Sequence, residues 1–157
     1  MDWFTLFRID YEQADWTFRL LCALLGGAIL GVDREVRHRR VGIRTYMMVS
    51  LGAAVFTIVA IEMAVDMTAR GLSADPSRVL QGLVGGLGFL GAGAIIQGDK
   101  SVGGMVTAAS LWVAGAVGLS AGLGYGALSL TAAVMASVIL WVSRFMEHRG
   151  REDRPDA

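Results

Sequence analysis

The sequence predicts an all-α integral membrane protein, a bundle of about five transmembrane helices with its amino terminus outside and its carboxyl terminus in the cytoplasm. Three observations lead to this fold class. Of 157 residues, 54% are hydrophobic and only 18% are charged, and the mean hydropathy is +0.54, which is apolar for a water-soluble domain. The apolar residues fall into blocks close to the roughly 20 residues that cross the hydrocarbon core as a helix. Lysine and arginine gather in alternate loops.

Five apolar blocks are expected to form the helices of a transmembrane domain over residues 17–144. The first block is short, so its helix is expected to continue over the charged residues at its ends. Residues 1–16 mix acidic side chains with aromatic residues at helical spacing, which predicts an amphipathic segment in the headgroup region. Residues 145–157 form a charged cytoplasmic tail. The five blocks are 17–32, 43–65, 79–96, 105–123 and 126–144.

The cationic residues predict how these helices are oriented, because loops rich in lysine and arginine stay on the cytoplasmic side. Ten of the 14 Lys and Arg residues lie in the first loop, the third loop and the tail. The other four lie near the amino terminus or around the second loop. Five helices alternate sides in the same pattern, so charge and hydropathy agree on an outside amino terminus.

The third block contains GLGFLG, which matches the G-x-G-x-x-G pattern of dinucleotide-binding folds. That fingerprint needs a preceding strand and an acid about 20 residues later, and neither is present. Small residues instead recur every four positions in the first, third and fourth blocks, which favours close helix packing in lipid. The third helix has small residues on more than one face and is expected to lie centrally. The glycines assigned to packing are Gly27, Gly31, Gly82, Gly86, Gly88, Gly91, Gly93 and Gly118.

Charged and polar residues gather at the predicted cytoplasmic ends of the helices, in VDREVRHRRVGIRT and QGDKSVGGMVT. Acids and bases there could pair into a charged network at the mouth of the bundle. The alternative is a set of arginines that contacts anionic lipid headgroups. Composition favours the lipid anchor for Arg37, Arg39 and Arg40 and leaves the other positions open. The candidate rim residues are Asp33, Arg34, Glu35, Arg44, Thr45, Asp99 and Thr107.

Several other classes of function and site are disfavoured. No ionisable residue lies near the middle of a block, as a proton relay or midplane cation site would require. The sequence contains no H-E-x-x-H, G-x-S-x-G or P-loop lysine, so an enzyme is not expected, nor is a cofactor, and any metal site is undetermined. A net charge of zero gives no nucleic-acid footprint. Trp112 is expected to fill the core, whereas Tyr46 and Trp141 are expected to be interfacial anchors.

Four motifs together resemble the MgtC/SapB family of bacterial inner-membrane proteins. They are GGAILGVDRE, VGIRTYMMVSLGAA, DPSRVLQGLVGGLGFLGAGAII and GMVTAASLWVAGAVGLSAGLG, in the family's order over residues 20–140. Asp33 stands where the family usually has Glu, and Tyr46 stands where some relatives have Asn or His. The shared motifs also carry over Asp75 and Arg78 of the outer loop and Trp112.

The resemblance implies a five-helix hydrophobic domain in the bacterial inner (plasma) membrane, often followed by a soluble ACT-like domain. The tail here is too short for that domain, so a short form is expected. Family members are linked to growth at low magnesium, to virulence and stress adaptation, and in one case to restraint of the ATP synthase. We therefore expect a self-associating modulator of ion or magnesium homeostasis that acts through membrane partners. The alternative is a small oligomeric ion channel or transporter with a cytoplasmic charged rim.

Overall fold

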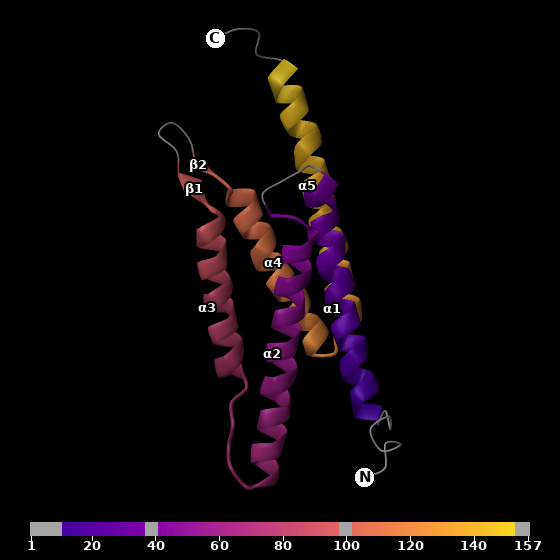
Figure 1. Ribbon diagram of the computed structural model, residues 1–157, viewed down its shortest axis with the longest axis vertical. Helices are drawn as coiled ribbons and strands as arrows, with labels where there is room; N and C mark the ends of the chain where they lie inside the picture. The colour runs from indigo at the N-terminus through magenta and orange to yellow at the C-terminus, as the bar shows by residue number, and fades with distance from the viewer. Residues whose placement is uncertain (1–10, 37–40, 98–101, 153–157) are drawn as a thin grey trace.

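The computed structural model describes residues 11–36, 41–97 and 102–152, and these form five helices and one short hairpin (Figure 1). The all-α prediction is confirmed. Four of the helices, all but α3, are long and apolar enough to span a membrane, so the chain is a multi-pass membrane protein. The helices are α1 (Tyr11–Val36), α2 (Ile43–Ala69), α3 (Ser77–Ala94), α4 (Met105–Gly122) and α5 (Gly126–Glu152).

Successive helices run in opposite directions, so each connection lies at one end of the bundle or the other (Figure 1). One end, which we call the hairpin end, holds the last turns of α1 and α3 and the first turns of α2 and α4. The opposite end, the turn end, holds residues 70–76 and 123–125. The first helix extends over its charged flanks, as predicted, from Tyr11 to Val36.

A two-stranded hairpin, which was not expected from the sequence, joins α3 to α4. Strand β1 (Ile96–Gln97) pairs antiparallel with β2 (Val102–Gly103). The chain then enters α4 through Gly104, whose φ of +88° lies in the left-handed region. A Cβ there would collide with the carbonyl group of Ala94. Glycine is therefore required at this junction both for its backbone conformation and for space.

Helix α4, and not α3, occupies the centre of the bundle. It packs against each of the other four helices, whereas α3 lies at one edge and packs mainly on α4. The prediction of a central third helix was wrong because a row of small residues marks a face that can be approached closely but does not show which faces have neighbours. The residues that α4 buries are mostly small: Ser110, Leu111, Ala114, Gly115, Val117, Gly118, Ser120, Ala121 and Gly122.

Glycines of α1 and α4 bring both helices directly against the backbone of α2. A Cβ added at Gly27 would lie 2.7 Å from the Tyr46 carbonyl oxygen, and one at Gly31 would lie 2.5 Å from the Cα of Ile43. A Cβ at Gly118 would collide with the backbone of Ser50. These are the close approaches that small residues at four-residue spacing allow between helices in lipid.

The glycines of α3 are placed differently. A Cβ at Gly82, Gly86, Gly88 or Gly93 would meet no described atom within 4 Å, and one at Gly91 would make only ordinary contact with Ala108 at 3.6 Å. Within one chain these four glycines therefore contact no neighbouring helix among the described residues. Their packing role stays a prediction for contacts with another chain.

Leu87 is the one large side chain of α3 that the bundle buries among the described residues. Leu87 is buried and its side chain occupies the space that a Cβ on Gly115 of α4 would need. We call this contact the Leu87–Gly115 notch. Its partner surface on α4 is available only because residue 115 lacks a side chain.

Tyr46 and Trp112 have the reverse of the burial that the sequence predicted. Tyr46 is fully buried among Leu30, Leu111 and Ala114, so it is a core residue and not an interfacial anchor. Trp112 is 47% exposed, so it does not fill the core. Trp141, the other predicted anchor, is exposed on α5.

Replacement of Gly118 by alanine should destabilise the protein, whereas the same change at Gly86 should not. The new methyl group at position 118 would collide with the α2 backbone, which cannot move without shifting the helix, and overpacking of this kind costs about 1–3 kcal/mol. At position 86 the methyl group meets open space, and alanine is the better helix former. Thermal unfolding of both variants in detergent tests this, and equal midpoints would contradict it.

Candidate functional site

Arg34 is the only charged side chain of the candidate rim that the structure buries among its described residues. Its exposed fraction is 6%. It lies near the end of α1, three residues after Gly31 and four after Leu30, which both face α2 and the core. Residues three and four apart share a helix face. Arg34 therefore belongs to the inward face of α1, one turn beyond the apolar core.

The guanidinium of Arg34 has unmet hydrogen-bonding capacity. Its Nε and Nη2 atoms are both inaccessible to water and have no hydrogen-bond partner in the part of the chain that the structure describes. An arginine side chain remains charged at any accessible pH. Buried guanidinium nitrogens without hydrogen-bond partners are energetically costly, so this side chain is the most unusual polar feature of the hairpin end.

A directional hydrogen-bond chain lies at the same end of the bundle. The Tyr46 hydroxyl oxygen and Ser110 Oγ are 2.5 Å apart, and Ser110 Oγ donates to the Thr107 carbonyl oxygen at 2.9 Å. Because Ser110 uses its hydrogen on Thr107, the Tyr46 hydroxyl donates to Ser110. These hydrogen bonds join α2 to α4. The predicted site residue Thr107 takes part through its backbone carbonyl group.

Glu35 caps the start of α2. Its Oε2 atom accepts a hydrogen bond from the backbone N–H of Ile43 at 3.0 Å. The carboxylate lies so close to Gly42 that a Cβ at that position would collide with it. A carboxylate is favourable at a helix amino terminus because it accepts an otherwise unpaired N–H and faces the positive end of the helix dipole. Glu35 therefore links the end of α1 to the beginning of α2.

The other rim candidates do not converge on Arg34. Asp33 is half-buried and lines a shallow apolar groove of about 410 Å³ between α1 and α5, beside Ser137 and Trp141. Arg44 and Thr45 are exposed. Neither Arg34 nor Arg44 forms an ion pair with Glu35. Asp99 lies outside the described residues. The described rim residues therefore do not form the expected charged network. Each of them has a separate environment.

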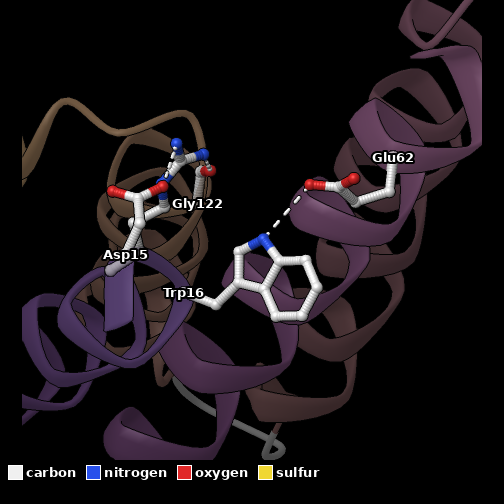
Figure 2. A network of polar contacts seen from close by, with 5 residues as sticks. Asp15, Trp16, Glu62 and Gly122 are labelled. Atoms are coloured by element: carbon white, nitrogen blue, oxygen red, sulfur yellow. Dashed lines mark hydrogen bonds and ion pairs between the residues drawn. The ribbon is translucent and has the colours of Figure 1, made fainter. Parts of the chain in front are cut away.

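A second polar cluster, which the sequence analysis did not single out, joins three helices at the turn end (Figure 2). Arg19 forms an ion pair with Asp15 one turn earlier in α1 and donates from Nη1 to the carbonyl oxygen of Gly122 at 3.0 Å. A cation at the last carbonyl groups of α4 is favoured by the helix dipole. Trp16 Nε1 donates to Glu62 Oε1 of α2 at 3.1 Å. The two contacts tie α1 to α4 and to α2.

The outer-loop candidates Asp75 and Arg78 form the start of α3. Asp75 Oδ1 accepts a hydrogen bond from the backbone N–H of Ser77 at 2.9 Å. Hydrogen bonds from the Ser77 side chain and backbone, with a smaller contribution from nearby Arg78, hold the pKa of the Asp75 carboxyl below its usual range. This arrangement is a local helix-start motif on the exposed surface.

An apolar groove of about 640 Å³ lies between α2 and α3. Glycines line both of its walls, with Gly52 on α2 and Gly82 and Gly86 on α3. Thr45 lies at its hairpin end. No group of three or more His, Cys, Asp or Glu side chains that could hold a metal ion occurs within the described ranges.

Comparison with known proteins identifies the relatives of this chain. A sequence profile described as MgtC family matches residues 20–149. The chain is 40% identical over 133 residues to Protein SrpB of Synechococcus elongatus, covering 78% of this chain and 72% of that protein. It is 33% identical over 130 residues to "Putative magnesium transporter YhiD" of Escherichia coli, covering 82% and 60%.

Protein MgtC of Salmonella typhimurium is 37% identical over 127 residues, which cover 80% of this chain and 52% of that protein. The chain therefore spans about half to three-quarters of the length of these relatives. No solved structure matches it.

Removal of the Glu35 carboxylate should destabilise the hairpin end. Glu35→Ala leaves the Ile43 N–H without its acceptor, and loss of such a cap costs about 0.5–2 kcal/mol. Glu35→Gln keeps an acceptor oxygen but loses the charge, so a smaller loss is expected. Thermal unfolding in detergent provides the measurement, with Arg44→Ala as an exposed control at the same end. A Glu35→Ala variant as stable as the wild type would exclude the capping role.

Proposed function

The chain belongs to the MgtC family, and on that premise we propose that it modulates ion or magnesium homeostasis in the bacterial inner membrane through contacts with other membrane proteins. We further propose that its amino terminus is outside and that the hairpin end faces the cytoplasm. The cationic loops support this orientation. The name of the relative YhiD supports a link to magnesium.

The observation that carries the partner-contact proposal is the exposure of the α3 glycines. Residues Gly82 and Gly86 face the groove toward α2, whereas Gly85 and Gly88 do not line it, so α3 has glycines on two open faces. Glycine adds little hydrophobic surface toward lipid, but it lets another backbone approach closely. Helix α3 is also absent from the four helices apolar enough to span alone. A second copy of this chain or another membrane protein would pack against the open faces of α3.

The rival function is a small oligomeric channel or transporter, which the name of YhiD favours. Buried and partly buried hydroxyl groups that could line a path within one chain are instead bonded to neighbouring helices. Ser50 Oγ donates to the Ala23 carbonyl at 2.8 Å, Ser129 Oγ to that of Val117 at 2.8 Å, and Ser137 Oγ to that of Ile29 at 3.1 Å. These bonds support a packed interior and favour the modulator.

Flux measurements separate the two functions. We expect purified protein in liposomes to move neither magnesium nor protons above the rate of empty vesicles, because its buried hydroxyls are used in packing. The assay follows a magnesium-sensitive and a pH-sensitive dye trapped inside the vesicles. Flux that depends on the protein and is reduced by changes in the α3 glycines would contradict the modulator proposal and support the transporter.

Bulky residues on α3 should disrupt assembly without unfolding the chain. The double variant Gly82→Leu/Gly86→Leu fills the groove face, and Gly85→Leu/Gly88→Leu fills the other face. Both add side chains where the single chain has open space. We expect one of them to weaken assembly by roughly tenfold or more, since small residues permit the close approach.

The assembly experiment measures molar mass in detergent by light scattering and growth at limiting magnesium of a strain that depends on the protein. The variant that loses assembly should also lose complementation, and the other serves as its matched control. If both variants keep the wild-type mass and support growth, the α3 faces are not the contact surface.

A further inference from the structure

The two unsatisfied nitrogens of Arg34 form one recognition edge. In a guanidinium group, the N–H of Nε and one N–H of Nη2 point in the same direction and are spaced to bind two oxygens of one anion. In Arg34 it is these two atoms that are buried without a hydrogen-bond partner in residues 11–36, 41–97 and 102–152. The N–H groups of Nε and Nη2 can therefore donate two hydrogen bonds to the same oxyanion.

The adjacent acid Glu35 does not fill this role, because its carboxylate accepts from the backbone N–H of Ile43. The hydroxyls of Tyr46 and Ser110 donate along their own chain to Thr107. These polar groups of the hairpin end are thus already committed to other bonds.

One helix start at this end has no anion in place. Helices α2 and α4 both begin here, and Glu35 already accepts the first N–H of α2. Helix α4 has no acidic residue in its first turn and no side-chain cap at Gly104, so its partial positive charge favours an anion. The last carbonyl groups of α1, by contrast, favour the cationic side chain of Arg34, which lies in the last turn of that helix. Because α1 ends at Val36, only two residues later, the guanidinium lies within one turn of the end of the helix, where access from the aqueous side or the headgroup layer is short.

We propose that Arg34 anchors an oxyanion site at the hairpin end that binds a phosphate group through Nε and Nη2. A phosphate presents paired oxygens to the fork and carries the charge needed to balance a buried guanidinium. The phosphate belongs either to a phospholipid headgroup, which lies at the depth where transmembrane helices end, or to a free phosphate compound in the cytoplasm. The site does not depend on the magnesium proposal, and it can be tested without a functional assay.

The test compares three proteins purified in a phosphate-free, uncharged detergent: wild type, Arg34→Lys and Arg34→Met. Inorganic phosphate is titrated against chloride at constant ionic strength. In parallel, each protein is placed in nanodiscs of phosphatidylglycerol or of a phosphate-free glycolipid. Thermal midpoints are measured throughout, and the Nε–H resonance of Arg34 is followed in ¹⁵N-labelled wild type. Arg44→Lys, an exposed arginine at the same end, is the matched control for general charge attraction.

We expect a phosphate source to raise the wild-type midpoint saturably and to shift the Arg34 Nε–H resonance. Arg34→Lys keeps the charge but loses the fork, so its apparent affinity should fall roughly tenfold or more. Arg44→Lys should respond as the wild type does. Without phosphate, Arg34→Met should be at least as stable as the wild type, because it removes an unpaired buried charge. A response to inorganic phosphate identifies a soluble ligand, and a response to phosphatidylglycerol alone identifies a lipid headgroup.

Three results would overturn the proposal. The first is a wild-type protein whose midpoint and Arg34 resonance respond to neither phosphate source. The second is an unchanged response in Arg34→Lys. The third is a strong loss of stability in Arg34→Met without phosphate, which would show that the guanidinium has a structural partner in the free protein. If the variants fail to fold, the wild-type resonance alone decides between binding and its absence.

Discussion

The fold depends on direct backbone contact between α2 and the helices on either side of it. Helix α1 approaches through Gly27 and Gly31, and α4 approaches through Gly118 and Gly122. Burial of apolar surface does not drive helices together inside a bilayer, because lipid tails are equally apolar. Dispersion contacts and hydrogen bonds at short range must do so, and both require that no side chain separates the backbones. Ser50 illustrates the result, since its carbonyl faces Gly118 while its hydroxyl bonds to α1.

Helix ends leave backbone N–H and C=O groups without partners inside the helix. At each end of the bundle, a long side chain from a neighbouring helix forms a hydrogen bond with one of these groups. Glu35 accepts the first N–H of α2 at the hairpin end, and Arg19 donates to the last carbonyl of α4 at the turn end. Each of these contacts joins two helices, so a helix cap also acts as an interhelical tie. Arg34 is the exception at the hairpin end, because two of its guanidinium nitrogens are buried without a hydrogen-bond partner among the described residues.

The sequence predicted the helices well and their neighbours poorly. Apolar block length located all five helices, and four-residue spacing found the glycines of α1 and α4 that contact α2. The same spacing in α3 predicted contacts that one chain does not make, since periodicity identifies a face and not what covers it. Tyr46 and Trp112 were misplaced for a related reason: depth along a helix can be read from position, but direction around it depends on packing. The capping role of Glu35 became visible only when Ile43 was placed beside it.

The Leu87–Gly115 notch gives α3 a different thermodynamic character from the rest of the molecule. Glycines bring α1 and α4 into backbone contact with α2, whereas α3 has one inserted leucine, an ordinary contact at Gly91 and open space at its other glycines. Local opening requires only the contacts of the segment that moves. Separation of α3 from the other four helices therefore breaks fewer close contacts than separation of α1, α2 or α4 would. Amide hydrogens of α3 would then exchange before those of these central helices, and the groove beside it would widen without any loss of the central core.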